Sequence, residues 1–181
     1  MIPETTFLIP VSQTPRKYDS SLPQKAQRIF YGKDYIAQIN ETSANFKGAG
    51  NPSEASFIKS LLAEVKTPYA VFVRKPCDIH ISDESLQELL NPLIKGTAIL
   101  TYSDFIAASN NDEGDHYQLI DYQIGSVRDD FEFGHLVAFD LKKVMVAIDE
   151  ARILDQQKVS GFYAFILSIA LATPPIQIPK Y

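Results

Sequence analysis

The stretch Tyr69-Ala70-Val71-Phe72-Val73 decides the fold, because five consecutive apolar residues after Thr67-Pro68 are typical of a strand buried on both faces of a parallel sheet. A helix is expected directly before it. Asn51 suits an N-cap, Pro52 the first helical position and Glu54 the acid of a capping box. Apolar residues then recur at helical spacing to about Lys66. A helix followed at once by a buried strand is half of a parallel βαβ unit.

The same alternation of helix and strand continues on both sides of this unit. An apolar run closed by proline, Thr6 to Pro10, reads as the first buried strand. A second helix is expected from Ser82 or Asp83 to Gly96, with a strand from Ala98 to Tyr102 behind it. Two more helices are expected, at Leu141–Ile153 and at Val159–Ala172. The sequence therefore predicts an α/β fold: a Rossmann-like, three-layer domain with a mostly parallel central sheet.

Three further expectations concern the remaining chain. The segments 28–31 and 35–39 are expected to form a second strand or a hairpin, and strands are expected at Tyr117–Tyr122 and His135–Phe139. With 181 residues, of which 45% are hydrophobic, the chain is long enough to bury one substantial core. We therefore expect residues 1–181 to form one domain.

Charge and composition exclude several function classes. The formal charge of −5, without a cluster of Lys and Arg, disfavours nucleic acid as a partner. The single cysteine, Cys77, fits a reducing compartment. The amino terminus does not resemble a secretory signal, and the longest apolar stretch, from Gly161 to Ala172, is shorter than the roughly 20 residues that cross a bilayer. We expect a cytoplasmic protein without a transmembrane segment.

The loop after the first strand is a candidate for nucleotide binding. Open α/β sheets bind ligands beyond the carboxyl ends of their strands, and the chain leaves the first strand at Pro10 into a long polar loop. Ser12, Thr14 and backbone groups there are suited to contact a base or a ribose. A solvated surface loop is the alternative interpretation.

A second candidate lies just past the buried strand at 69–73. Arg74 and Lys75 are suited to offset the charge of a diphosphate, and Asp78 is the only acid nearby that could bind a divalent cation. The alternative is a turn at a strand end with solvated charges.

The third candidate is a pair of adjacent acids, Asp129 and Asp130, after Arg128. Neighbouring side chains of an extended segment point in opposite directions, so one carboxylate can face a cleft while the other binds backbone or Arg128. The cleft-facing carboxylate would be a general base that removes a proton from a sugar hydroxyl. An Arg–Asp pair that only holds a loop is the competing explanation.

Taken together, these segments resemble a known family. The first strand, the helix start at Gly50–Ala55 and the strand at Pro68–Val73 look like the nucleotide-binding half of family-2 glycosyltransferases, and later blocks resemble longer bacterial glycosyltransferase-like proteins. These later blocks are Thr101–Phe105, Ile120–Gln123, Gly125–Gly134 and Gly161–Tyr163.

The resemblance implies a GT-A fold that binds a nucleotide-diphosphate sugar, usually with Mg²⁺ or Mn²⁺, and transfers the sugar to an acceptor. By position, Asp78 would be a metal ligand, and Asp129 or Asp130 would activate the acceptor. Arg74, Lys75 and Pro76 occupy the place of the family's first metal-binding acid. Two hypotheses follow: a transferase acting on an unidentified acceptor, or a non-catalytic domain that binds a nucleotide sugar or a partner protein, alone or as an oligomer.

Overall fold

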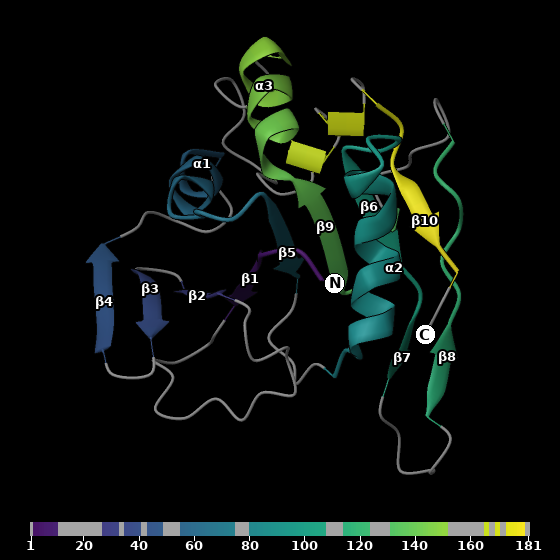
Figure 1. The fold of residues 1–181 in the computed structure, drawn as a ribbon, viewed down its shortest axis with the longest axis horizontal. Coiled ribbons are helices and arrows are strands. Elements are labelled where there is room, and N and C mark those ends of the chain that lie inside the picture. Colours follow the sequence, from purple (N-terminus) through teal and green to yellow (C-terminus); the bar gives the residue numbers. More distant parts are fainter. Residues whose placement is uncertain are drawn as a thin grey trace.

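A computed structural model describes residues 2–10, 27–32, 35–40, 43–48, 55–74, 80–107, 114–123, 131–151, 165–166, 169–170 and 173–179. Within these ranges eight strands form one twisted sheet in the order β10-β6-β9-β5-β1-β2-β3-β4 (Figure 1). Their bounds are β1 Thr5–Pro10, β2 Gln27–Gly32, β3 Tyr35–Asn40, β4 Ser43–Gly48, β5 Tyr69–Val73, β6 Leu100–Ser103, β9 Leu136–Asp140 and β10 Ile176–Ile178. A separate two-stranded ribbon pairs β7, Phe105–Ala107, with β8, Asp115–Tyr117.

The sheet is mixed, and most of its strands run one way. β1 is parallel to β2 and β5, and β6 is parallel to β10. β9 is antiparallel to both of its neighbours, β5 and β6, and β3 is antiparallel to β2 and β4. Among the described strands of this sheet, only β3 and β9 therefore oppose the common direction. The predicted α/β class with a mostly parallel, Rossmann-like sheet is confirmed, and the 28–39 region forms the hairpin of β2 and β3.

Helices cover both faces of the sheet. The helix α1, Ala55–Ala63, packs on one face together with α3, Leu141–Ala151, and with the helical residues 165–166 and 169–170. The helix α2, Asp83–Ile94, covers the opposite face. The three-layer arrangement predicted from the sequence is thereby confirmed. None of the helices in the described ranges has the length and apolarity to cross a membrane.

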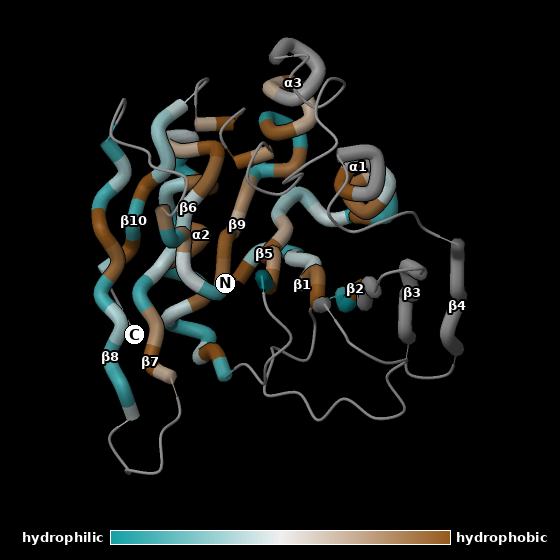
Figure 2. Tube along the Cα trace, turned by 180° about the vertical axis from the view of Figure 1, so that it is seen from behind, coloured by the Kyte–Doolittle hydropathy of each residue, from teal (hydrophilic) through white to brown (hydrophobic). Residues whose placement is uncertain are grey.

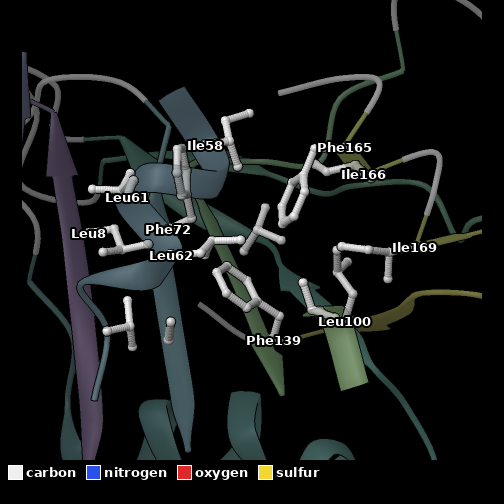
Figure 3. Close-up of a cluster of buried hydrophobic side chains, with 14 of the residues drawn as sticks. Leu8, Ile58, Leu61, Leu62, Phe72, Leu100, Phe139, Phe165, Ile166 and Ile169 are labelled. Atoms are coloured by element: carbon white, nitrogen blue, oxygen red, sulfur yellow. The ribbon is translucent and has the colours of Figure 1, made fainter. Parts of the chain in front are cut away.

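Two apolar cores separate the layers. Figure 3 shows the first, where Leu62 of α1 and Phe139 of β9 lie among side chains of the sheet and of residues 165, 166 and 169. The second core joins α2 to the other face through Leu86, Leu89, Leu90 and Leu93, which pack against Phe7 and Val71. Alternate residues of β1 and β5 enter opposite cores, which explains why both strands read as unbroken apolar runs. In Figure 2 the central strands are accordingly hydrophobic, whereas β8 is largely hydrophilic.

The start and end of α2 predicted from the sequence are confirmed. Ser82 is its N-cap, and its side chain accepts a hydrogen bond from the Ser85 N–H at 3.0 Å. Gly96 follows the C-cap with φ +75, a left-handed conformation that glycine adopts without steric cost. The helix start expected at 51–54 lies outside the described residues.

The prediction of a strand over Tyr117–Tyr122 is wrong beyond its first residue. The strand ends at Tyr117, and residues 118–123 form no ladder. The Leu119 N–H donates to the Asp104 carboxylate at 2.8 Å, and the Ile120 carbonyl accepts from the Tyr102 hydroxyl at 2.7 Å. Side chains therefore satisfy backbone groups that a ladder would otherwise have paired.

Candidate functional site

The carboxyl edge of the sheet brings three segments together. In the parallel pair of β1 and β5, Leu8 lies opposite Phe72, so Pro10 and Arg74, each two residues further on, leave the sheet at the same edge. β9 begins at that edge because it runs the other way, with Leu136 opposite Val73. The Arg74 N–H donates to the His135 carbonyl at 3.0 Å, which extends the ladder by one residue. The start of β9 and the end of β5 are thus directly joined.

Arg74 also uses its side chain to hold the chain that leads into β9. Its Nη1 donates to the Glu132 carboxylate, forming an ion pair, and to the Gly134 carbonyl at 3.1 Å. The Arg74 side chain is 20% exposed and that of Glu132 is 46% exposed. The guanidinium is therefore mostly buried, with its carboxylate partner on the solvent side. Charge-assisted hydrogen bonds of this kind are stronger than neutral ones.

Gly134 allows the segment 131–134 to pass close to Ser103 and Leu119. Its φ is +72, and a Cβ there would lie 2.9 Å from the Ser103 carbonyl oxygen and 2.7 Å from a methyl group of Leu119. Both its conformation and its surroundings exclude a larger side chain. The segment can therefore pass tightly between the end of β6 and residue 119 on its way to Arg74.

Aromatic side chains hold the segment 131–134 against the core. Phe131 and Phe133 lie 4.7 Å apart, and Tyr102 packs edge-on against both, at centroid distances of 6.3 and 5.4 Å. Tyr122 also contacts both phenylalanines. Burial raises the pKa of the Tyr102 phenol far above its ordinary value, and it raises the pKa of Tyr122 as well. Glu132, between two core-facing phenylalanines, is directed outward by this alternation.

A buried carboxylate ties the neighbouring strands together. Asp104, 6% exposed, lies between β6 and β7, and its Oδ1 accepts from the Leu119 N–H and from Gln177 Nε2 at 2.7 Å. Gln177 belongs to β10. One side chain thereby links the base of the β7–β8 ribbon to the edge of the main sheet.

The structure describes only part of the predicted site. Arg74 is at the carboxyl edge, as expected, but it has protein partners that sequence reasoning missed. Pro10 ends β1 at the same edge. The remaining candidates lie outside the described residues: Ser12, Thr14, Lys75, Asp78, Arg128, Asp129 and Asp130.

Glu132 was not among the sequence candidates. Its position between Phe131 and Phe133 was a signal that it faces outward, but its partner lies 58 residues away in the chain and no local pattern identifies it. Within the described ranges, no group of three or more His, Cys, Asp or Glu side chains is arranged to hold a metal ion. The predicted metal ligand, Asp78, is not covered by that finding.

Comparison with known proteins finds similarity among solved structures and none among protein-family models or curated proteins. No family model matches the sequence, and no curated protein matches it. Among solved structures, the chain is similar to 2-C-methyl-D-erythritol 4-phosphate cytidylyltransferase from Thermus thermophilus, with 12% sequence identity and a TM-score of 0.43. The match covers 96% of this chain and 71% of the other.

Proposed function

We propose that this protein binds a nucleotide-diphosphate sugar at the carboxyl edge of its sheet and transfers the sugar to an acceptor hydroxyl. The observation that carries the proposal is the position of Arg74. This cation leaves the sheet at the edge where β1 also ends, and its side chain contacts the segment that follows the two adjacent acids. Ligands of open α/β sheets bind at such edges.

The acids are connected to Arg74 through the chain itself. Asp130 and Asp129 precede Glu132 by two and three residues. An extended chain spans at most about 3.6 Å per residue, so this short separation in the sequence supports a site that Arg74 and the two acids share. The proposal therefore assigns one of these carboxylates to the acceptor and the cations to the donor.

The proposed reaction is a single displacement. The Asp129 or Asp130 carboxylate takes the proton of the acceptor hydroxyl, whose oxygen forms a bond to the anomeric carbon. The bond from that carbon to the diphosphate breaks, and its electron pair leaves with the nucleoside diphosphate. Arg74, Lys75 and Arg128 would stabilise the developing negative charge. The family resemblance implies Mg²⁺ or Mn²⁺, which Asp78 would hold and which would offset negative charge on the diphosphate; Asp78 lies outside the described residues.

One observation favours a second candidate function. Glu132 already neutralises Arg74, so a diphosphate would have to compete with a carboxylate for the guanidinium. Together with the missing first acid of the metal pair, this supports a domain that binds a nucleotide sugar or a protein without catalysing transfer.

Calorimetry with UDP-glucose and GDP-mannose, each with and without Mn²⁺, tests the proposal when it is combined with a coupled assay for released nucleoside diphosphate. Binding with turnover supports the transferase. Binding without turnover supports the second candidate. If neither nucleotide sugar binds under either condition, both ligand proposals are wrong.

A further inference from the structure

A three-ring stack projects from the carboxyl edge beside the candidate site. Phe105 of β7 lies opposite Tyr117 of β8, and their rings are parallel to within 3° with centroids 4.8 Å apart. The His135 ring packs on Phe105 in a tilted arrangement, with centroids 4.3 Å apart and planes inclined by 34°. Phe105 is thus the central ring of a stack formed by three separate segments, which we call the ring stack. Tyr117 is its outer member and is 48% exposed.

The ring stack is held in place at its base. Asp104 immediately precedes Phe105, and Leu119 follows Tyr117 by two residues. Because the buried Asp104 carboxylate accepts the Leu119 N–H, it closes the ribbon just below the paired rings. The second hydrogen bond of this carboxylate, from Gln177, attaches the closure to β10. The outer face of Tyr117 is therefore presented by a fixed element, which lowers the entropic cost of binding a ligand.

The chemistry of this surface fits a neutral sugar ring. An aromatic face is apolar and carries partial negative charge, so it favours flat groups that present C–H bonds, as a pyranose does. Asp115 lies on the same side of β8 as Tyr117 and is exposed, where a carboxylate can accept hydroxyl hydrogen bonds. The same charge disfavours a phosphate or another anion. A neutral polyhydroxylated ligand can contact both the Tyr117 ring face and the Asp115 carboxylate.

His135 connects the ring stack to the candidate site. Its ring packs on Phe105, while its backbone carbonyl accepts the Arg74 N–H. We propose that the exposed face of Tyr117 binds a sugar ring of the acceptor, next to the donor site that Arg74 marks. That this sugar belongs to the acceptor rests on the proposed transferase function, whereas sugar binding by Tyr117 does not.

Saturation-transfer NMR with cellotetraose, maltotetraose and chitotetraose tests this binding site without any donor. We expect at least one of them to bind the wild-type protein. Tyr117→Ala should weaken that binding about tenfold or more, because it removes a stacking contact, and Tyr117→Phe should retain it. Ile106→Ala is the matched control: Ile106 is 45% exposed on the same ribbon, but it alternates with Phe105 and faces the other side. It should leave binding unchanged.

Several outcomes would overturn the inference. Binding by none of the three glycans, or equal binding by wild type and Tyr117→Ala when circular dichroism shows both to be folded, excludes the ring stack as a sugar site. A wild-type dimer that Tyr117→Ala dissociates in light scattering would show that a second copy covers the ring instead. Glycan binding that depends on Tyr117, in a protein that binds neither UDP-glucose nor GDP-mannose, would refute the proposed transferase and leave the sugar site standing.

Discussion

The Arg74 guanidinium and the Glu132 carboxylate form an ion pair across the carboxyl edge of the sheet, although 58 residues separate them in the chain. The pair joins the end of β5 to the segment that carries the proposed catalytic acids. Because Glu132 is the more exposed partner, its carboxylate lies on the solvent side of the guanidinium, and an incoming anion would have to compete with it. The pair thus connects the two segments on which the proposed function depends.

Glu132→Gln is expected to tighten the binding of UDP or GDP by a few fold, because it removes a carboxylate that competes for Arg74. Arg74→Ala is expected to weaken the same binding about tenfold or more, since it removes a charge-assisted contact to the diphosphate. Calorimetry at constant ionic strength measures both changes. If Arg74→Ala leaves nucleotide affinity unchanged, Arg74 serves only to hold the 131–134 segment.

Asp129→Asn and Asp130→Asn distinguish the base from a structural acid. We expect at least one of them to lower turnover of the nucleotide sugar by about 10²-fold or more while nucleotide affinity stays within a few fold. Asp121→Asn is the control, because it removes an exposed carboxylate from a nearby segment that the mechanism does not use. Unchanged turnover in both Asp129 and Asp130 variants would remove them from the mechanism.

Gly134→Ala is expected to destabilise the protein by about 2 kcal/mol or more, because an L-residue is strained at its positive φ and its Cβ would collide with the Ser103 carbonyl. Gly96→Ala is the matched control. Gly96 has a similar φ of +75, but the nearest atom that a Cβ at this position would meet is the flexible Lys143 Nζ, at 3.5 Å. Urea unfolding of both variants measures the difference. Equal losses would mean that the close approach at Gly134 contributes nothing beyond backbone conformation.

Tyr102→Phe tests the buried phenol and its pH dependence. Burial raises the pKa of Tyr102 above the ordinary 10.0, so the folded state keeps the proton that the unfolded chain releases near that pH. The contribution of the neutral phenol to the free energy of unfolding is therefore fully present below about pH 10, and it is lost as the pH rises further. At pH 7, Tyr102→Phe should lower the free energy of unfolding by about 1 kcal/mol, because it removes the hydrogen bond to the Ile120 carbonyl.

Denaturant unfolding of wild type and Tyr102→Phe at pH 7 and at pH 10.5 or above checks this expectation. The wild type should lose more stability between the two pH values than the variant does. Parallel losses would show that Tyr102 does not titrate differently in the folded and unfolded states.

The sequence by itself determined the local elements. Unbroken apolar runs marked β1 and β5 because both faces of these strands are covered. Ser82 and Gly96 marked the ends of α2 because capping and left-handed backbone depend on a few adjacent residues. The boundaries of β8 were mistaken because the backbone of residues 119 and 120 bonds to Asp104 and Tyr102, which lie in an earlier part of the chain.

Only the tertiary structure decided which of these elements become neighbours. An apolar strand has the same pattern in either direction, so nothing local indicated that β9 runs antiparallel between β5 and β6. That insertion brings His135 and Glu132 to Arg74, at the edge where β1 and β5 end and where the site is proposed. The free energy of such contacts comes from side chains far apart in the chain, and therefore appears only when the whole sheet has assembled.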